Sequence, residues 1–378
     1  MTTATLAGKQ DWIEVARTVG PRFAADAARH DAENSFVAEN YPVLRESGLL
    51  SALVPEELGG GGATHAEVAS VIRELAQHCP ATALALSMHQ HLLAAAVWRY
   101  RRGQPGEALL RRVAAENLVL VSTGAGDWLS SSGQAERVEG GFRVTARKGF
   151  ASGCEAGDLL LTSAPYLDPS DGPTVLHFAV PLSAPGVSIE RDWMTLGMRG
   201  TGSHTVVIDG VLVAEGAVSL RRPRGKWHPS WAVIVTVAMP LIMAAYLGAA
   251  EAAAALALEG ARKRRDDPLV QLLAGELETD LAGARAAWSQ SLALANGFDF
   301  EPTESVASAA LTCKSLVARA VMAAGEKALE LSGGSGFYAR SGIERLLRDL
   351  HGAQFHPLPD KKQALFSGRV ALGLDPAG

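Results

Sequence analysis

The sequence predicts a protein of three parts: a helical N-terminal domain, a middle β domain and a C-terminal helical bundle. Two changes of hydrophobic period predict this order. Apolar residues recur at three- and four-residue spacing over 12–112, alternate with polar residues over 118–220, and return to helical spacing after Trp227. The expected domains are residues 1–117, 118–224 and 225–378. A chain of 378 residues is too long for one small core, so it fits several packed units.

Charge and cysteine content exclude several classes of protein. With 35 Lys and Arg against 40 Asp and Glu, and a net charge of −5, the chain has no basic stripe for a phosphate backbone. Cys79, Cys154 and Cys313 lie far apart without CxxC spacing, which indicates neither a disulfide framework nor a zinc site. The N-terminus lacks the apolar run of a secretory signal. We therefore expect a cytoplasmic protein with no metal and no nucleic-acid partner.

The N-terminal domain is expected to be helical, with one marked interruption. The apolar spacing between Val68 and Leu75 is that of one helix face. The run Gly59 to Gly62 breaks the pattern, and since no strand precedes it and no GK[ST] follows, it predicts a loop between helices and not a phosphate site.

Two histidines in SMHQHLL are candidate site residues. His89 and His91 are two residues apart, so they lie on different faces of a helix and cannot share one metal ion as an i, i+4 pair does. One of them could face a ligand while the other packs, and a structural role for both is the alternative.

The middle domain is predicted from β-branched, alternating stretches such as GFRVTARKGF, TVLHFAVPL and HTVVIDGVLV. Three loops between such stretches concentrate small and polar residues that either approach a ligand or only end a strand. They are STGAGDWLSSS at 122–132, KGFASG at 148–153 and LGMRGTGSHTV at 196–206.

The stretch from Trp231 to Ala250 carries no charge and is long enough to cross a bilayer. Pro240 interrupts it, however, the helical pattern continues into Glu251, and no second span follows. We expect this stretch to be the buried central helix of the bundle and expect no membrane contact.

Near the C-terminus, RDLHGAQFHPLPDKKQ holds His351 and His356 around a turn broken by Pro357 and Pro359. A histidine in a loop is more often solvated or capping than catalytic. Composition alone therefore leaves both roles open.

Read together, five segments resemble the acyl-CoA dehydrogenase superfamily over nearly the whole chain. They are VPEELGGGG, the GAG of STGAGD, KGFASG, LGMRGTGSHTV and ELSGGSGFYARSGIERLLRD, in family order. The resemblance implies the acyl-CoA dehydrogenase fold, with an N-terminal all-α domain, a middle β-barrel-like domain and a C-terminal four-helix bundle. It also implies a flavin, FAD or FMN, between β domain and bundle, and a homo-oligomer, most often a tetramer, because the flavin site crosses a subunit boundary.

The same resemblance assigns cofactor residues. Ser152 matches a hydroxyl near the flavin N5, and Phe150 matches the aromatic residue that packs on the isoalloxazine. The remaining matches lie in the GAG loop, in the turn before the last strands, and in a glycine turn that approaches a neighbouring subunit's flavin. They are Ser122, Thr123 and Gly124; Arg199, Thr201 and Ser203; and Gly333, Gly334 and Gly336.

Three departures from the family pattern argue against an ordinary dehydrogenase. The glutamate that removes the α proton is replaced by Pro357 in QFHPLP, and the alternative position for this base falls near Ala232. The threonine-glutamate-proline ahead of GAG becomes Val121, Ser122 and Thr123. The arginine-x-phenylalanine-glycine that grips the flavin diphosphate becomes RKRRDDP, so permanent FAD binding is not expected.

A branch of the superfamily lacks the same features: the two-component flavin monooxygenases similar to dibenzothiophene monooxygenase. They use O2 and reduced flavin from a separate reductase, and a histidine follows their last long helix. This implies a monooxygenase acting on a small or medium organic molecule, with catalytic residues His356, Ser152 and His91 or His89. Two alternatives stay open: a thioester dehydrogenase with a displaced base, Asp127 or His356, and a flavin-binding assembly protein that has lost catalysis.

Overall fold

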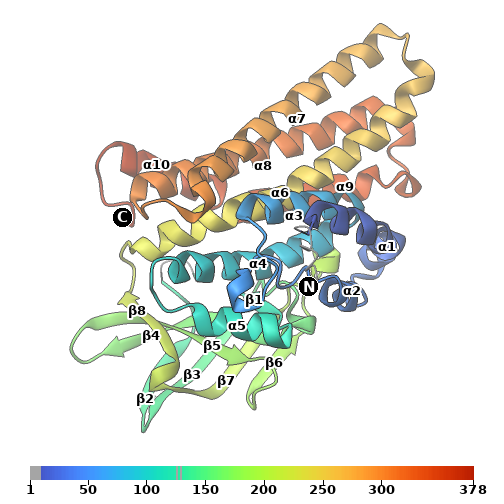
Figure 1. Ribbon diagram of the computed structural model, residues 1–378. Helices are drawn as coiled ribbons and strands as arrows, with labels where there is room; N and C mark the ends of the chain where they lie inside the picture. The colour runs from blue at the N-terminus through green and yellow to red at the C-terminus, as the bar shows by residue number, and fades with distance from the viewer. Residues whose placement is uncertain (1–9, 125–126, 128–129) are drawn as a thin grey trace, which may run out of the picture.

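The computed structural model describes residues 10–378 apart from 125–126 and 128–129. Its three parts follow the chain from a helical layer through a β domain to a long bundle (Figure 1). The N-terminal helices are α1 (Trp12–Glu33), α2 (Asn40–Glu46), α3 (His65–His78), α4 (Pro80–Tyr100) and α5 (Glu107–Glu116), with the 3-10 turn η1 (Glu56–Leu58) before α3. The predicted Gly59 to Gly62 loop lies between η1 and α3, where Thr64 and Glu67 form a capping box that starts α3.

The β domain consists of two four-stranded sheets. One has the order β1-β4-β5-β8 and the other the order β2-β3-β7-β6. The strands are β1 (Leu120–Ser122), β2 (Gln134–Val138), β3 (Gly141–Lys148), β4 (Leu159–Asp168), β5 (Gly172–Pro181), β6 (Val187–Glu190), β7 (Thr205–Ala214) and β8 (Val218–Pro223). The two sheets enclose a separate apolar core around Phe142 and Phe178.

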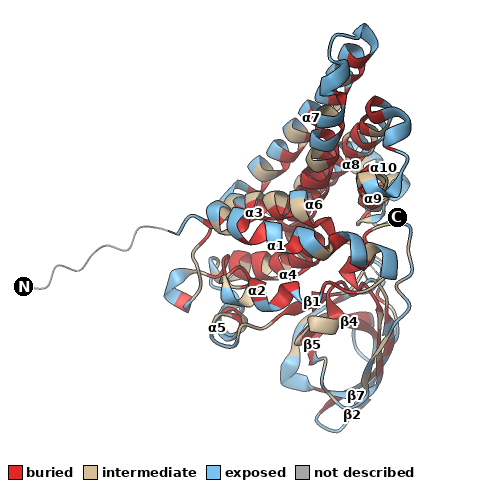
Figure 2. Cartoon of the chain, turned by 90° about the vertical axis from the view of Figure 1, so that its right-hand side faces the viewer, coloured by how far each residue is buried: buried red, intermediate tan, exposed pale blue. Residues whose placement is uncertain are grey.

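The C-terminal part is a helical bundle whose long helices lie side by side (Figure 1). Its helices are α6 (Pro229–Ala261), α7 (Pro268–Ala295), α8 (Glu304–Ser332), α9 (Ile343–Leu350) and α10 (Asp360–Ala371). α6 packs on α8 and α7 on one side and on α3 and α4 on the other. Because one helix serves as core for two domains, it is buried nearly all round, as Figure 2 shows.

The charge-free stretch of α6 is buried as expected from the sequence. In the described chain, the helical spans Pro229–Arg264 and Glu304–Ser335 are long and apolar enough to cross a membrane by length and composition, but the apolar window of the first is 94% buried inside the protein. The first charge after it, Glu251, is bound by Arg73 of α3 at 2.7 Å and Arg285 of α7 at 2.8 Å. This charge is therefore paired within the helical core, as burial requires.

Candidate active site

Two loops of the β domain lie against each other. The loop that begins at Ser122 follows β1, and KGFASG follows β3. The Gly124 N–H donates to the Gly149 carbonyl over 3.1 Å. Gly124 has no room for a side chain, since a Cβ there would lie 2.7 Å from the Cβ of Phe150. The structure therefore brings Ser122, Thr123 and Gly124 beside Phe150.

Phe150 presents an aromatic surface at this place. Its side chain is 61% exposed and its φ is +58°, a conformation that bulky residues rarely adopt and that is enriched at functional sites. Its ring meets Trp193 edge-on, with centroids 5.5 Å apart, and the Trp193 indole N–H donates to the Met198 carbonyl over 3.1 Å. A groove of about 490 Å³ opens beside Trp193, a size within the usual range for small-molecule sites.

Three hydroxyl groups form a chain that ends at Ser152. Ser152 Oγ lies 2.7 Å from Ser203 Oγ, which lies 2.7 Å from Thr201 Oγ1. The Thr201 hydroxyl donates to the Met198 carbonyl over 2.8 Å. The Gly153 N–H also donates to the Thr201 carbonyl, so the backbone fixes KGFASG against this turn. The structure thus brings together three residues predicted from two separate motifs.

Asp127, considered from the sequence as a displaced base, is committed to other groups. Its carboxylate accepts from the fully buried Lys148 ammonium over 2.8 Å and from the Thr123 hydroxyl over 2.6 Å. Lys148 also donates to the Ser132 carbonyl over 2.9 Å. This cluster fixes the loop beside Phe150, and Asp127 has a structural partner in place of a substrate proton.

His356 lies in the turn between η10 (His351–Phe355) and α10. Its Nε2 is 2.6 Å from the hydroxyl of Tyr246 on α6. Burial raises the pKa of Tyr246 well above 10, so the phenol stays protonated and can donate to Nε2. Gly352 permits this contact, because a Cβ there would lie 2.7 Å from the Tyr246 oxygen. The contact therefore holds the imidazole ring against α6.

Lys314 of α8 holds the same turn from the other side. Its ammonium is buried and donates to the Leu358 carbonyl over 3.0 Å and to the Gln354 carbonyl over 3.4 Å, on either side of His356. Loss of hydration, the Lys314 charge and His91 together lower the pKa of His356 to about 3. His356 is therefore neutral throughout the physiological pH range.

His91 of α4 is a second neutral imidazole near His356. Burial lowers its pKa to about 4, and its charge would oppose protonation of His356. Its Nδ1 lies 3.4 Å from the Ser87 carbonyl, and within the described residues Nε2 makes no hydrogen bond. A side chain at Gly153 would contact Ala85 of the same helix at 3.9 Å. α4 thus runs from the Ser152 loop toward the two histidines.

His89 has a structural role. Its Nε2 pairs with the Leu50 carbonyl at 2.7 Å, and its Nδ1 accepts the Leu120 N–H over 3.0 Å. Both ring nitrogens are occupied, which ties α4 to β1 and to the segment after α2. His89 therefore cannot orient a substrate as expected from the sequence, and His91 is the candidate that remains.

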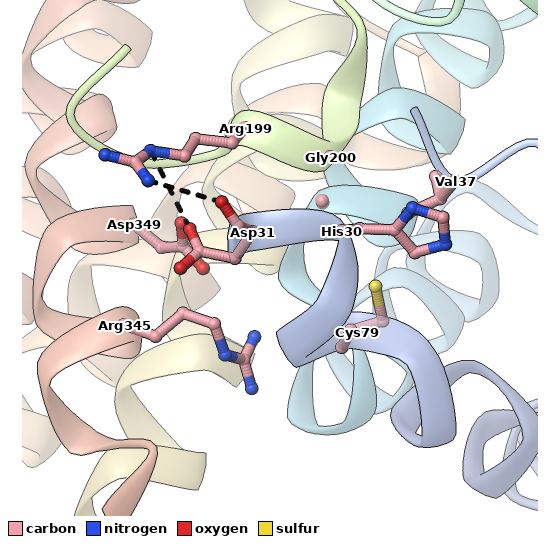
Figure 3. Close-up of a pocket in the computed structure, with 10 residues that line it drawn as sticks. His30, Asp31, Val37, Cys79, Arg199, Gly200, Arg345 and Asp349 are labelled. Atoms are coloured by element: carbon pink, nitrogen blue, oxygen red, sulfur yellow. Dashed lines mark hydrogen bonds and ion pairs between the residues drawn. The ribbon is translucent and has the colours of Figure 1, made fainter. Parts of the chain in front are cut away.

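Arg199 links its own loop to α1, and through Asp31 to α9. Its guanidinium donates to the Thr195 carbonyl over 2.8 Å and to the Asp31 carbonyl over 3.2 Å, while the Asp31 carboxylate binds Arg348 of α9. Figure 3 shows Arg199 and Asp31 beside a cavity of about 10 Å³, which holds one water at most. The contact of Arg199 with a flavin stays a prediction, since the contacts of this side chain here are with protein groups from α1 and its own loop.

The glycine turn is not part of the group around Ser152 within one chain. Gly333 and Gly334 lie in η8 (Gly333–Ser335) at the end of α8, and a Cβ on either would have no neighbour within 4 Å in the described chain. Gly336 packs back on Ser332. Gly333 and Gly334 are exposed, and their contact with a neighbouring subunit's flavin stays a prediction.

Two residues of this site, Tyr246 and Lys314, have no signal in the sequence. Tyr246 lies inside the apolar run of α6, and Lys314 lies in LTCKSLVARA on α8. In the sequence each is an ordinary helical residue. Only the packing of α6 and α8 places them at the turn that carries His356.

Burial of neutral histidines predicts sensitivity to acid. The pKa is lowered to about 4 for three histidines and to about 3 for two, and loss of hydration is the largest cause in each. These are His65, His89 and His91, and His177 and His356. Between about pH 6.5 and 4 the unfolded chain binds more protons, so stability falls as pH falls, by about 1.4 kcal/mol per histidine and pH unit.

One group opposes this trend. Burial raises the pKa of Asp349 to about 6, which favours the native state as pH falls through that value. Five histidines outweigh one carboxyl, so urea unfolding at pH 7.5, 6.0 and 5.0 is expected to show a steady loss of stability. An unfolding midpoint that does not change over this range would contradict the burial of these imidazoles in neutral form.

The residues around Ser152 fit a flavin. An exposed aromatic ring and a hydroxyl with acceptor capacity suit a planar heterocycle with polar edges. The groove beside Trp193 is lined by other residues, among them Met194 and His204. The glycine at 124 lets the two loops approach closely enough to form one surface. No group of three or more His, Cys, Asp or Glu in the described residues is placed to hold a metal ion.

Comparison with known families gives matches at both ends of the chain. Residues 12–117 match the N-terminal domain of acyl-CoA dehydrogenase, and residues 241–360 match its C-terminal domain. The chain belongs to the acyl-CoA dehydrogenase superfamily. This superfamily member is 26% identical to YdbM of Bacillus subtilis, a putative acyl-CoA dehydrogenase, over 93% of this chain and 94% of YdbM.

Other relatives of this superfamily member are monooxygenases. Dibenzothiophene monooxygenase of Rhodococcus qingshengii is 28% identical over 93% of this chain and 90% of its own. The solved structure of KijD3 with FMN and a dTDP-linked amino sugar has a TM-score of 0.87 and 25% identity, and covers 98% of this chain and 96% of KijD3. Amino sugar nitrososynthases and a probable FMNH2-dependent monooxygenase match as well. These comparisons confirm the predicted fold and the class of flavin-dependent oxidoreductase.

Proposed function

We propose that the protein is a two-component flavin monooxygenase that takes reduced FMN from a separate reductase and oxidises a small or medium organic molecule with O2. The observation that carries the proposal is His356, a neutral imidazole held by Tyr246 and Lys314 at the segment where a dehydrogenase has its glutamate. FMN is favoured over FAD because KijD3 was solved with FMN and a matched relative is FMNH2-dependent.

The chain's own residues supply binding and proton placement. Reduced flavin supplies the two electrons with which O2 oxidises the substrate. Ser152 and Phe150 would hold the flavin. His356 would hydrogen-bond the reacting oxygen as a neutral imidazole held by Tyr246 and Lys314, while His91 would orient the substrate. The apolar face of α6 excludes water, which would otherwise promote loss of oxidising equivalents as peroxide.

The competing function is an acyl-CoA or carrier-protein thioester dehydrogenase. The similarity to YdbM, a putative acyl-CoA dehydrogenase, supports this alternative. Removal of a proton α to a thioester needs a base, which in the family is a carboxylate. The charged groups that affect the pKa of His356 are Lys314 and His91, and neither is a carboxylate. His356 itself, with a pKa of about 3, is too weak a base for that step near pH 7. Geometry therefore favours the monooxygenase.

Rapid mixing distinguishes the two functions. Protein is mixed anaerobically with chemically reduced FMN and then with oxygen, and the absorbance of oxidised flavin is followed. A monooxygenase is expected to delay the return of that absorbance relative to free FMN, because the site shields the reacting flavin. Protein that purifies with stoichiometric FAD and is bleached by an acyl-CoA without any reductase would establish the dehydrogenase instead.

We expect a homo-oligomer, most simply a tetramer. Arg264 donates to the Leu331 carbonyl over 2.8 Å, so the exposed basic turn η6 (Arg262–Arg264) lies beside the glycine turn. Phe337 follows that turn and is 83% exposed, which suits contact with another subunit. The basic side chains here can bind the phosphate of a neighbour's flavin.

Light scattering on the purified protein at micromolar concentration checks the assembly. Four copies of the 39.6 kDa chain are expected, and a monomer would contradict the proposal.

The three cysteines are free and buried, which agrees with the cytoplasmic location expected from the sequence.

A further inference from the structure

The hydroxyl chain from Met198 to Ser152 has one favoured direction of donation, in which the Thr201 hydroxyl donates to the Met198 carbonyl. A carbonyl oxygen can only accept, so the 2.8 Å contact between Thr201 Oγ1 and the Met198 carbonyl commits the Thr201 proton. Thr201 then accepts from Ser203 over 2.7 Å, and Ser203 in turn accepts from Ser152 over 2.7 Å. The proton of each hydroxyl is used inside the protein.

Ser152 is the end of the chain that reaches the surface. Thr201 is fully buried, Ser203 is 4% exposed and Ser152 is 8% exposed. With its proton committed to Ser203, Ser152 offers a ligand only the lone pairs of its oxygen. The site therefore presents an acceptor at this point and no donor.

We propose that this polarised chain selects the redox state of the flavin, with Thr201 as the residue that sets the selection although it lies too deep to touch the ligand. The inference rests on the proposed function. A reduced flavin carries an N–H at N5, which a hydroxyl acceptor satisfies. An oxidised flavin has an unprotonated N5, which is a hydrogen-bond acceptor. It forms no hydrogen bond with the Ser152 oxygen while that oxygen also acts as an acceptor. To donate to N5, Ser152 must reverse the whole chain, and the Thr201 hydroxyl must then donate to Ser203 and give up its hydrogen bond to the Met198 carbonyl.

The Met198 carbonyl favours this direction of donation by accepting from the Thr201 hydroxyl, but it does not depend on that hydroxyl for its own hydrogen bonds. It also accepts the Thr201 backbone N–H over 3.1 Å and the Trp193 indole N–H over 3.1 Å. Removal of the Thr201 hydroxyl therefore leaves no unsatisfied buried carbonyl, and the fold should tolerate Thr201→Val. In that variant Ser203 is free to donate to Ser152, and Ser152 is free to donate to oxidised N5.

The test measures dissociation constants for oxidised FMN and for dithionite-reduced FMN under anaerobic conditions. Wild type is expected to prefer reduced FMN about tenfold or more, the usual worth of one well-placed hydrogen bond. Thr201→Val is expected to lower this preference about tenfold, mainly by tighter binding of oxidised FMN. Thr201→Ser keeps the hydroxyl and should keep the preference. The potential of bound FMN should fall by about 30 mV in Thr201→Val, the equivalent of that tenfold change.

Ser203→Ala provides a second test, because it frees the Ser152 proton by a different route and should also tighten oxidised FMN. If both redox forms bind and neither Thr201→Val nor Ser203→Ala changes the preference, the inference is wrong while the proposed function stands. If wild type binds neither form of FMN, the proposed function fails and the inference fails with it.

Discussion

Replacement of His356 with Ala is expected to leave the fold intact and to convert most of the reduced flavin and O2 consumed into hydrogen peroxide. The side chain lies in a turn and is only half-buried, so its loss opens no large cavity in the core. Removal of a positioned acid or base typically slows the step that it assists by about a hundred- to ten-thousand-fold. Peroxide and product are measured together, per reduced FMN consumed.

His351→Ala is the matched control. His351 is five residues earlier, at the C-terminal end of α9, where a histidine more plausibly interacts with the helix dipole than with a substrate. Its replacement is expected to leave the ratio of product to peroxide near that of wild type. Equal peroxide release by wild type and His356→Ala would return His356 to an ordinary loop histidine.

The domain order was predictable because it depends on short-range patterns. A change from period 3.6 to period 2 and back is visible in any window of the sequence, and the structure changes from α5 to β1 and from β8 to α6 where these patterns change. The burial of α6 was predictable for a related reason. A helix with no charged residue over two-thirds of its length needs apolar neighbours on every side.

The roles of individual site residues were less predictable, because they depend on partners far away in the chain. His89 and His91 look equivalent in SMHQHLL, and only the Leu50 carbonyl and the Leu120 N–H make His89 structural. Arg199 lies in a polar turn that suits an anion, but its guanidinium donates to the backbone carbonyl of Asp31 in α1. Such outcomes are fixed by tertiary packing and have no local signature.

The grouping of Ser152 with Thr201 and Ser203 could be predicted from the resemblance to a family. No single motif predicted it. KGFASG and LGMRGTGSHTV are each ordinary loop sequences, but their collinear order predicted that Ser152, Thr201 and Ser203 lie near one ligand, and the structure brings the three together. The direction of donation along the chain could not be predicted, since it depends on the Met198 carbonyl at one end.

Replacement of Lys314 with Met is expected to impair coupling about tenfold without a comparable loss of stability. Met fills the space of the lysine stem but carries no charge and no donor. The Leu358 and Gln354 carbonyls lose their bonds to the ammonium, so the turn that carries His356 becomes less well positioned, and one lost hydrogen bond of ordinary strength corresponds to about tenfold. The ammonium, however, no longer has to be buried, which offsets much of the lost bonding.

Lys314 could act only by holding the turn in place, or also by its charge on His356. A role in holding the turn alone would not change the titration of His356, so the pKa of His356 distinguishes the two explanations. The Lys314 charge lowers the pKa of His356, so the pKa should rise in Lys314→Met, while burial still keeps it below the ordinary value. NMR of labelled histidine rings measures this rise directly. Lys361→Met, which removes an exposed lysine from α10, is the control and should change neither coupling nor titration. Unchanged coupling together with an unchanged His356 titration in Lys314→Met would contradict a role for Lys314 in holding His356 neutral and in place.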